Sequence, residues 1–322
     1  MKKLIFGYGA TGKSVESYFQ KNKIEYFIHD DKKLDIENHL IFDKKKFNEI
    51  DEVIISPGIK PSHPFVTEIN SEGLTINTDI DLFNKVYKGK IIGVTGTNGK
   101  TTFVNLLTEY LNSHQIKSIA VGNVGKSPLE IVGEDYEYVV MELSSFQLYY
   151  LNNLILFKAI VLNIFEDHLD WHSDFKDYSN SKLKILKFIT NNENRSLQEL
   201  QTIYEEKENK ELLFKSAGVL DIVSKLTLHE DTVYSFIKTV DDLGLSIDSL
   251  SDFLLNYKTE AHRFELVDKI KDVTYINDSK STNFNSLSMA TTKINNGILL
   301  LHGLTKNISS RDLKISKKVK TI

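Results

Sequence analysis

The residues best suited to chemistry form a short loop at 96–102, Gly-Thr-Asn-Gly-Lys-Thr-Thr, directly after the apolar stretch 91–94. Glycines let a backbone curl around phosphates, Lys100 would neutralise β- and γ-phosphate charge, and the hydroxyl of Thr101 suits Mg²⁺. The strict G-x-x-x-x-G-K-[ST] spacing is not met, because the first glycine, Gly93, comes one residue early. The loop is therefore a compact variant, and its strand–loop–helix setting disfavours an ordinary Gly-Lys turn.

Two more reactive groups follow apolar stretches typical of buried parallel strands. Glu142 ends the stretch at 139–141, and His168 follows the one that ends at Leu162. Because carboxyl ends of parallel strands share one edge of a sheet, a carboxylate and an imidazole are expected beside the bound phosphates, as metal ligands. Lys182 lies on an expected helix, where a lysine is by itself usually a solvated charge.

The N-terminal segment Gly7-Tyr8-Gly9-Ala10-Thr11-Gly12 fits G-x-G-x-x-G after a strand, and Asp30 follows Gly12 by 18 residues. Such a turn aims backbone N–H groups and a helix N-terminus at a pyrophosphate. Three interpretations stay open: a dinucleotide site, a turn whose glycines serve packing alone, and a site for the diphosphate of a UDP-sugar. The Ser56-Pro57-Gly58 turn at another strand end could add backbone donors.

Two polar segments lie near the C-terminal end, His262-Arg263-Phe264-Glu265 and 277–283, Asn-Asp-Ser-Lys-Ser-Thr-Asn. The second follows a strand and is dense in small polar groups, which could mean only a helix cap and turn. Alternatively, Arg263 and Lys280 reach across a cleft to polyphosphate and acyl groups.

The rest of the chain must hold these groups in place. Strands and helices alternate, which indicates an α/β protein with parallel sheets, and 322 residues suffice for two or three domains. Expected strands are 4–6, 26–28, 52–55, 91–94, 138–141, 159–162, 273–276 and 298–301. The polar stretch between Asn191 and Asn256 is expected to be helical. We expect domains at 1–88, 89–259 and 260–322.

Composition excludes several classes of protein. The net charge of -4 and pI of about 6.2 give no reason to expect a nucleic-acid partner. No cysteine is present, which excludes disulfides and thiolate metal sites. No apolar run is long enough for membrane insertion, and residues 1–6 are too short for a signal peptide. The cytoplasm, where ATP is available, is the expected compartment.

Taken in order, these motifs resemble the Mur ligases of peptidoglycan synthesis, and most of all their D-glutamate-adding branch. The resemblance covers residues 4 to about 190 and 260 to 306. Its further motifs are Thr-Asp-Ile-Asp-Leu-Phe at 78–83, Gly-Asn-Val-Gly at 122–125, Glu-Leu-Ser-Ser-Phe-Gln-Leu at 142–148, Glu-Asp-His at 166–168 and Tyr-x-x-x-Lys at 178–182. The implied fold has a Rossmann-like N-terminal domain, a central P-loop ATPase-like domain and an incomplete Rossmann-like C-terminal domain.

The resemblance also implies roles for single residues. Those implied to bind ATP are Gly96, Thr97, Asn98, Gly99, Lys100, Thr101, Thr102, Arg263 and Asp278. Those implied to bind the UDP-linked substrate are Ala10, Thr11, Gly12, Asp30, Ser56, Pro57, Gly58 and Asn123. D-Glutamate would meet His168, Lys280, Thr282 and Lys306. Mg²⁺ would meet Thr101, Glu142, His168 and Lys182, the last as its carbamate. The implied catalytic residues are Lys100, Glu142, His168, Lys182 and Lys280.

The implied reaction joins D-glutamate to UDP-N-acetylmuramoyl-L-alanine through an acyl phosphate, and uses ATP and Mg²⁺. The chain is expected to act as a monomer. An NAD-dependent oxidoreductase would leave the second loop unexplained, and folylpolyglutamate synthesis would not predict a UDP-type first domain. A protein that only binds nucleotide or UDP-sugar stays the main alternative.

The sequence departs from the family in two places. The His-Asn pair expected near the adenine, late in the central domain, is absent, and residues 214–221 are a poor substitute. In the stretch 299–306, His302 replaces a glycine and the chain ends soon after, which suggests a shortened third domain. We expect such a domain to leave apolar surface uncovered and a strand edge unpaired, with weak turnover.

Overall fold

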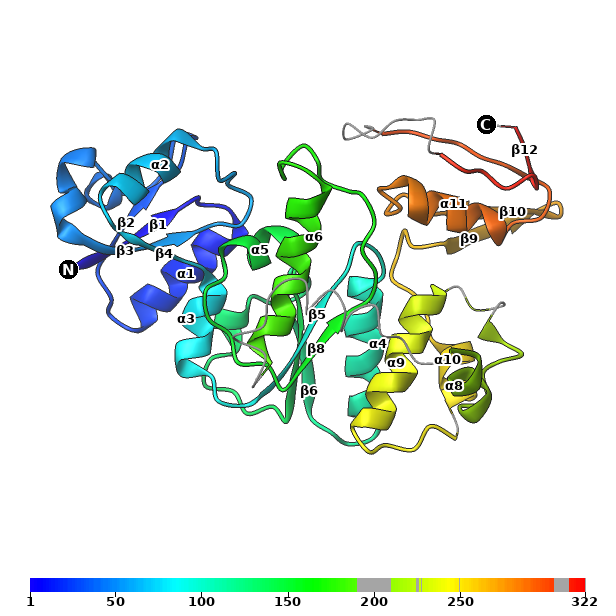
Figure 1. Ribbon diagram of the computed structural model, residues 1–322. Helices are drawn as coiled ribbons and strands as arrows, with labels where there is room; N and C mark the ends of the chain where they lie inside the picture. Colours follow the sequence, from blue (N-terminus) through cyan, green and yellow to red (C-terminus); the bar gives the residue numbers. More distant parts are fainter. Residues whose placement is uncertain (190–209, 224–225, 227, 249, 304–312, 322) are drawn as a thin grey trace. The chain divides into compact units, whose positions relative to one another are not determined.

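The structure is a computed structural model that describes residues 1–189, 210–223, 226, 228–248, 250–303 and 313–321. Figure 1 shows its helices and strands, coloured along the sequence. The chain divides into two compact units. The first contains Met1–Val94, Leu111–Ile160 and Ser181–Leu200, and the second contains Thr95–Tyr110, Val161–Asn180 and Gln201–Ile322. The expected division into three domains stays a prediction.

The first sheet has the strand order β2-β1-β3-β4, and all its pairings are parallel. Its strands are β1 (Lys2–Phe6), β2 (Tyr26–His29), β3 (Ile50–Ile55) and β4 (Thr75–Asn77). The helical elements along this part of the chain are α1 (Ala10–Lys21), η1 (Asn38–Leu40), η2 (Lys44–Glu49), α2 (Pro64–Ser71) and α3 (Asp79–Val86). Most apolar side chains of β1 and β3 are buried, as expected of parallel strands covered on both faces.

Helix α3 begins with a capping box, in which Thr78 Oγ1 accepts from the amide of Asp81 and Asp81 Oδ2 accepts from the amide of Thr78. The neighbouring Asp79 is 3% exposed. Burial, opposed by nearby backbone N–H groups and reinforced by the charge of Asp81, raises the pKa of Asp79 to about 6.

The second sheet has the order β6-β7-β5-β8. Its strands are β5 (Lys90–Thr95), β6 (Ser118–Gly122), β7 (Tyr138–Glu142) and β8 (Lys158–Val161), and β7 pairs in parallel with both β5 and β6. The accompanying helices are α4 (Lys100–Ser113), η3 (Pro128–Ile131), α5 (Ser145–Tyr150), α6 (Phe175–Leu183) and η4 (Lys184–Phe188). In both sheets the strands predicted from the sequence are confirmed to within two residues at either end.

The second unit continues with helices α8 (Lys210–Ser216), α9 (Glu230–Asp242), α10 (Leu250–Asn256) and α11 (Phe284–Thr292). The buried face of α9 packs on α4 and α10, where Tyr110 meets Phe236 and Phe253 edge-on, with ring centroids 5.3 and 5.0 Å apart. The expected helical character of 191–256 is confirmed in its described part.

The C-terminal region contains an antiparallel pair, β9 (Glu265–Ile270) and β10 (Val273–Asn277), and a short parallel pair, β11 (Gly297–Ile298) and β12 (Val319–Thr321). The strand predicted at 298–301 is wrong beyond Ile298, because residues 299–301 make no strand pairing. Apolar side chains are exposed on both strands of the first pair: Leu266 on β9 is 67% exposed and Val273 on β10 is 54% exposed. Across the described residues, no helix has the length and apolar character needed to span a bilayer.

Candidate functional site

The loop between β5 and α4 has a backbone that only glycine tolerates at two positions. Gly96 and Gly99 have φ values of 156° and 81°. A Cβ on Gly96 would lie 3.0 Å from Leu162 Cβ, and a Cβ on Gly99 would collide with Thr232 Oγ1. The loop therefore needs glycine for conformation and for close packing, as expected of a backbone shaped around phosphates.

The loop is anchored to the segment after β8. Asn163 accepts from the amide of Thr97 with its carbonyl and from the amide of Asn98 with Oδ1, both at 2.8 Å. Thr97 Oγ1 lies 2.9 Å from the hydroxyl of Tyr178 and accepts from the amide of Phe165, also at 2.9 Å. These contacts fix the loop backbone in advance of any ligand.

Lys100, the first residue of α4, turns back over this loop. Its Nζ donates to the carbonyls of Gly96 and Thr97 at 2.7 and 3.0 Å. A positive charge thus lies at the loop, next to an α-helix N-terminus, which is an arrangement that attracts phosphate.

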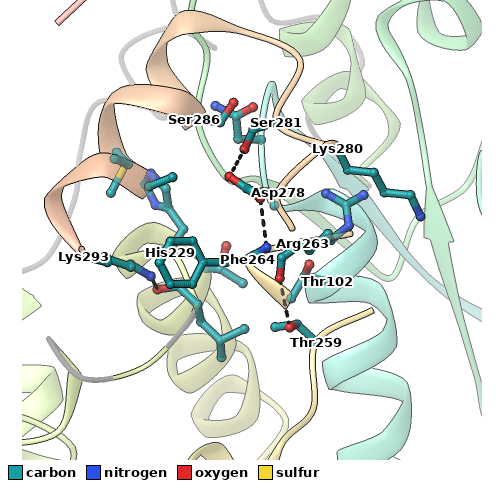
Figure 2. Close-up of a pocket in the computed structure, with 16 residues that line it drawn as sticks. Thr102, His229, Thr259, Arg263, Phe264, Asp278, Lys280, Ser281, Ser286 and Lys293 are labelled. Carbon is teal, nitrogen blue, oxygen red and sulfur yellow. Dashed lines mark hydrogen bonds between the residues drawn. The ribbon is translucent and has the colours of Figure 1, made fainter. Parts of the chain in front are cut away.

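A cavity of about 120 Å³ lies next to the loop within the second unit (Figure 2). Of the residues expected to bind ATP or D-glutamate, it is lined by Asn98, Gly99, Thr102, Arg263, Asp278 and Lys280. Thr282 is exposed and does not line it, and Lys306 lies outside the described residues. The cavity therefore unites the loop with the two polar segments predicted from the C-terminal region.

Asp278 organises one wall of this cavity. Its Oδ1 accepts from the amide of Phe264 at 2.9 Å, and its Oδ2 accepts from Ser281 Oγ at 2.6 Å. Figure 2 shows Arg263 and Lys280 on one side of Asp278, with Phe264, His229 and Lys293 on the other. Both cationic and aromatic groups are thus available to a ligand in the cavity.

Glu260 links this wall to α4. It accepts from Thr102 Oγ1 at 3.1 Å and from Asn105 Nδ2 at 2.6 Å, and its Oε2 lies 3.6 Å from Arg263 Nε. Thr102, expected to contact ATP, therefore lines the cavity with a hydroxyl already bonded to Glu260.

The sequence did not single out His229, which also lines the cavity. It is the N-cap of α9, and its Nδ1 accepts from the amide of Asp231 at 3.1 Å. In the neutral ring Nε2 must then hold the proton, and this buried atom has no hydrogen-bond partner in the described part of the chain. Burial, opposed by the charge of Asp231, lowers the pKa of His229 and favours that neutral form.

His229 is followed by Glu230, so it does not form the expected His-Asn pair. The segment 214–221, already a poor match in the sequence, contains the end of α8 and the turn after it and does not line the cavity.

Asn283 ends the polar segment 277–283 that the sequence singled out, but no role was predicted for it. Its amide pairs reciprocally with that of Asn98: Nδ2 donates to Asn98 Oδ1 at 2.7 Å, and Asn98 Nδ2 donates to Asn283 Oδ1 at 3.3 Å. Asn283 also caps α11 by accepting from the amide of Ser286 at 3.0 Å. The phosphate loop is thus bonded directly to the start of α11.

The expected metal ligands come from both units. Glu142 and Lys182 belong to the first, and Thr101 and His168 belong to the second, so their convergence stays a prediction. Glu142 is 1% exposed and its Oε1 accepts from Asn123 Nδ2 at 2.8 Å. Lys182 is 2% exposed, which overturns its interpretation as a solvated surface charge. His168 has a φ of 55° and a side chain that is 35% exposed.

Among the residues that the structure describes, no three His, Asp or Glu side chains gather closely enough to bind a metal ion by themselves. Mg²⁺ needs fewer, because substrate phosphates and water commonly complete its shell. The hydroxyl of Thr101 and the carboxylate of Glu142 are oxygen donors of the type that it prefers.

In the first unit, the glycine turn predicted from the sequence meets two other strand ends. A Cβ on Gly12 would overlap the carbonyl of Gly7, which explains the glycine. Asp30 Oδ2 accepts from the amide of Tyr8 at 2.6 Å, and Ser56 Oγ donates to the carbonyl of Gly7 at 2.8 Å. Burial would raise the pKa of Asp30, but backbone donors lower it overall, so the carboxylate is ionised.

Pro57 and Gly58 continue from Ser56 in the turn after β3, and Ala10 and Thr11 begin α1. The predicted residues of this site therefore form one cluster, with the exception of Asn123, which is exposed after β6 and bonded to Glu142.

The fold and the loop are typical of α/β proteins that bind nucleotides, and comparison with known proteins makes the class specific. The MurD-like N-terminal domain family matches residues 1–78, and the Mur ligase middle domain family matches residues 94–241. The chain is 30% identical over 355 residues to UDP-N-acetylmuramoylalanine–D-glutamate ligase of Thermotoga petrophila, with 98% of this chain and 81% of that protein covered. It is 35% identical to the protein of the same name from Francisella tularensis subsp. tularensis, with 95% and 74% covered.

Among solved structures, MurF ligase from Thermotoga maritima in complex with ADP superposes with a TM-score of 0.50 at 15% identity, covering 92% of this chain and 72% of that one. This likeness confirms the fold. The chain belongs to the Mur ligase family, a family of ATP-dependent ligases.

Proposed function

We propose that this protein is an ADP-forming acid–amino-acid ligase that adds D-glutamate to UDP-N-acetylmuramoyl-L-alanine during peptidoglycan synthesis. The observation that supports it most is the anchored phosphate loop with Lys100, beside a cavity lined by Arg263 and Asp278. Its relatives of 30% and 35% identity are named for that activity.

In this proposal the triphosphate of ATP lies on the loop amides of 96–101, where Lys100 offsets its charge. The cavity accepts the nucleoside, with Arg263 and Asp278 as polar contacts. The neutral Nε2–H of His229 offers a hydrogen-bond donor that has no protein acceptor in the described residues. Mg²⁺, when bound by Thr101, Glu142, His168 and the carbamate of Lys182, supplies positive charge that lowers the barrier to phosphoryl transfer.

The proposed reaction has two steps. A carboxylate oxygen of the L-alanyl group attacks the γ-phosphorus, an O–P bond forms, and the bond to the β-phosphate oxygen breaks to release ADP. The amine of D-glutamate then attacks the acyl carbonyl, a C–N bond forms, phosphate leaves and the amine loses a proton. His168, whose side chain is partly exposed, is the proposed acceptor of that proton at a stage when its ring does not coordinate Mg²⁺.

The two substrates are proposed to bind in different units. The UDP diphosphate meets the glycine turn at 7–12, with Asp30 and the 56–58 turn beside it, and Asn123 contacts the same substrate. D-Glutamate meets His168, Lys280 and Thr282, together with Lys306. A monomeric enzyme of the cytoplasm, where ATP and the UDP-linked substrate are available, is part of the same proposal.

The test is phosphate release from ATP and Mg²⁺ in the presence of UDP-N-acetylmuramoyl-L-alanine, with and without D-glutamate. Release that depends on D-glutamate is the expected result. Lys100→Met should abolish it, whereas Lys258→Met, at an exposed position, should not. Binding of ATP and the UDP-linked substrate without any release would instead support a protein that only binds these ligands.

A further inference from the structure

Lys293 lies in the cavity wall but belongs to none of the motifs found in the sequence. It is the C-cap residue of α11. Among the residues that the structure describes, its Nζ donates to the main-chain carbonyls of Leu226 at 3.0 Å and Leu228 at 3.1 Å. The same ammonium lies 5.7 Å from the ring centroid of Phe264.

This lysine is held in a partly apolar setting. Burial lowers the pKa of Lys293 from its ordinary value, and the charge of Asp278 opposes that shift. The side chains of Leu226 and Leu228 are each 5% exposed. A half-buried lysine in such a place contributes through specific hydrogen bonds, because water has only limited access to replace them.

The carbonyls that Lys293 bonds come just before His229, which lines the cavity. Leu228 precedes His229, the N-cap of α9, and one turn further along α9 Thr232 packs against Gly99 of the phosphate loop. Lys293 therefore connects the end of α11 to the element that presents His229 and supports the loop.

We infer that Lys293 is a positioning residue for nucleotide binding, which holds the carbonyls of Leu226 and Leu228 and thereby fixes the orientation of His229 and the first turn of α9. The inference rests on the proposed nucleotide site. It requires no contact between Lys293 and the reacting atoms, so its loss should weaken nucleotide binding more than it slows the chemical step.

The test compares Lys293→Met, which keeps the aliphatic stem but removes the donors, with Lys293→Arg, which keeps them, and with exposed Lys258→Met as the control. Dissociation constants for ATP and the KM and kcat of phosphate release are measured for each. Lys293→Met should raise the Kd and the KM for ATP about tenfold, the scale of one charge-assisted hydrogen bond, with kcat within about twofold. Lys293→Arg and Lys258→Met should bind like the parent.

A second readout needs no nucleotide. The charge of Lys293 helps to lower the pKa of His229, so an NMR titration of the His229 ring, assigned by its loss in His229→Gln, should show a higher pKa in Lys293→Met. If Lys293→Met fails to fold, Lys293→Gln, which keeps an amide donor, replaces it in both measurements.

Unchanged ATP binding in folded Lys293→Met would overturn the inference. If the parent protein binds no nucleotide, the proposed function fails, and the His229 titration then decides separately whether Lys293 sets the environment of that ring. An equal drop in kcat and rise in KM, unrescued by arginine, would mean general loss of structure and would also count against a positioning role.

Discussion

Replacing Gly99 with alanine tests whether the phosphate loop is shaped by backbone conformation or by packing. The substitution is expected to destabilise the folded state in two ways. A left-handed φ costs an alanine roughly 1–2 kcal/mol, and Gly99 has a φ of 81°. The added Cβ would also collide with Thr232 Oγ1, and overpacking of this kind costs about 1–3 kcal/mol.

Gly244 provides the matched control, because its φ is 72° and nothing lies within 4 Å of the position its Cβ would take. Gly244→Ala should therefore show the conformational cost alone. In urea unfolding followed by circular dichroism, Gly99→Ala should lower the free energy of unfolding by about 1–3 kcal/mol more than Gly244→Ala does. Only Gly99→Ala should also weaken binding of a fluorescent ATP analogue.

The collision can be relieved at its other partner. Thr232→Ala removes the atom that the new Cβ meets, whereas Thr232→Val replaces it with a methyl group of similar size. In the Gly99→Ala background, alanine at position 232 should restore about 1–3 kcal/mol of the free energy of unfolding, whereas valine should not. A double-mutant cycle measures this coupling between the two positions. Equal destabilisation by Gly99→Ala and Gly244→Ala, or equal rescue by the two residues at 232, would refute the packing argument.

Asn283→Ala should lose both the cap of α11 and the amide pair with Asn98, whereas Asn283→Ser keeps a capping hydroxyl. In thermal unfolding, serine should therefore recover most of the roughly 0.5–2 kcal/mol of stability that the cap contributes, while ATP binding stays weak. Recovery of both stability and ATP binding would mean that the amide pair has no role. Asp79→Asn should change the pH dependence of stability. A carboxyl group whose pKa is about 6 in the folded state, against an ordinary 3.8, stabilises the fold most below pH 3.8 and loses that contribution as the pH rises through 6. Between pH 4 and 7 the free energy of unfolding of the parent should fall by on the order of 2–3 kcal/mol more than that of Asp79→Asn, as measured by urea unfolding at each pH. Parallel pH profiles for the two proteins would contradict the shifted pKa.

Much of the fold could be predicted because its strands are continuous apolar runs followed by glycine or polar residues. That pattern located β1, β5 and β7. It also located the loop after β5, because the residues of that motif are consecutive in the sequence. The same reasoning overextended the strand at 298–301, since an apolar run shows that burial is possible, not that a pairing partner exists. Residues Leu300 and Leu301 are in fact 90% and 44% exposed.

The missed parts of the site depend on contacts that local patterns do not encode. Asn283 and Asn98 are 185 residues apart, and each alone is an ordinary turn or cap residue. His229 caps α9 through a ring nitrogen, which differs from the Ser, Thr, Asp or Asn that usually signals a helix start. Lys182 was predicted as a site residue only through the family resemblance, because it follows Ser179, Asn180 and Ser181, and this polar run conceals its burial.

The carboxylate of Glu260 has a thermodynamic consequence. By bonding Thr102 and Asn105 while lying beside Arg263, it orders the first turns of α4 and the cavity wall together. Each residue that must be ordered on binding costs roughly 1–2 kcal/mol of conformational entropy. A ligand that enters here meets groups whose freedom was already lost when the chain folded, so more of its contact enthalpy is retained as affinity.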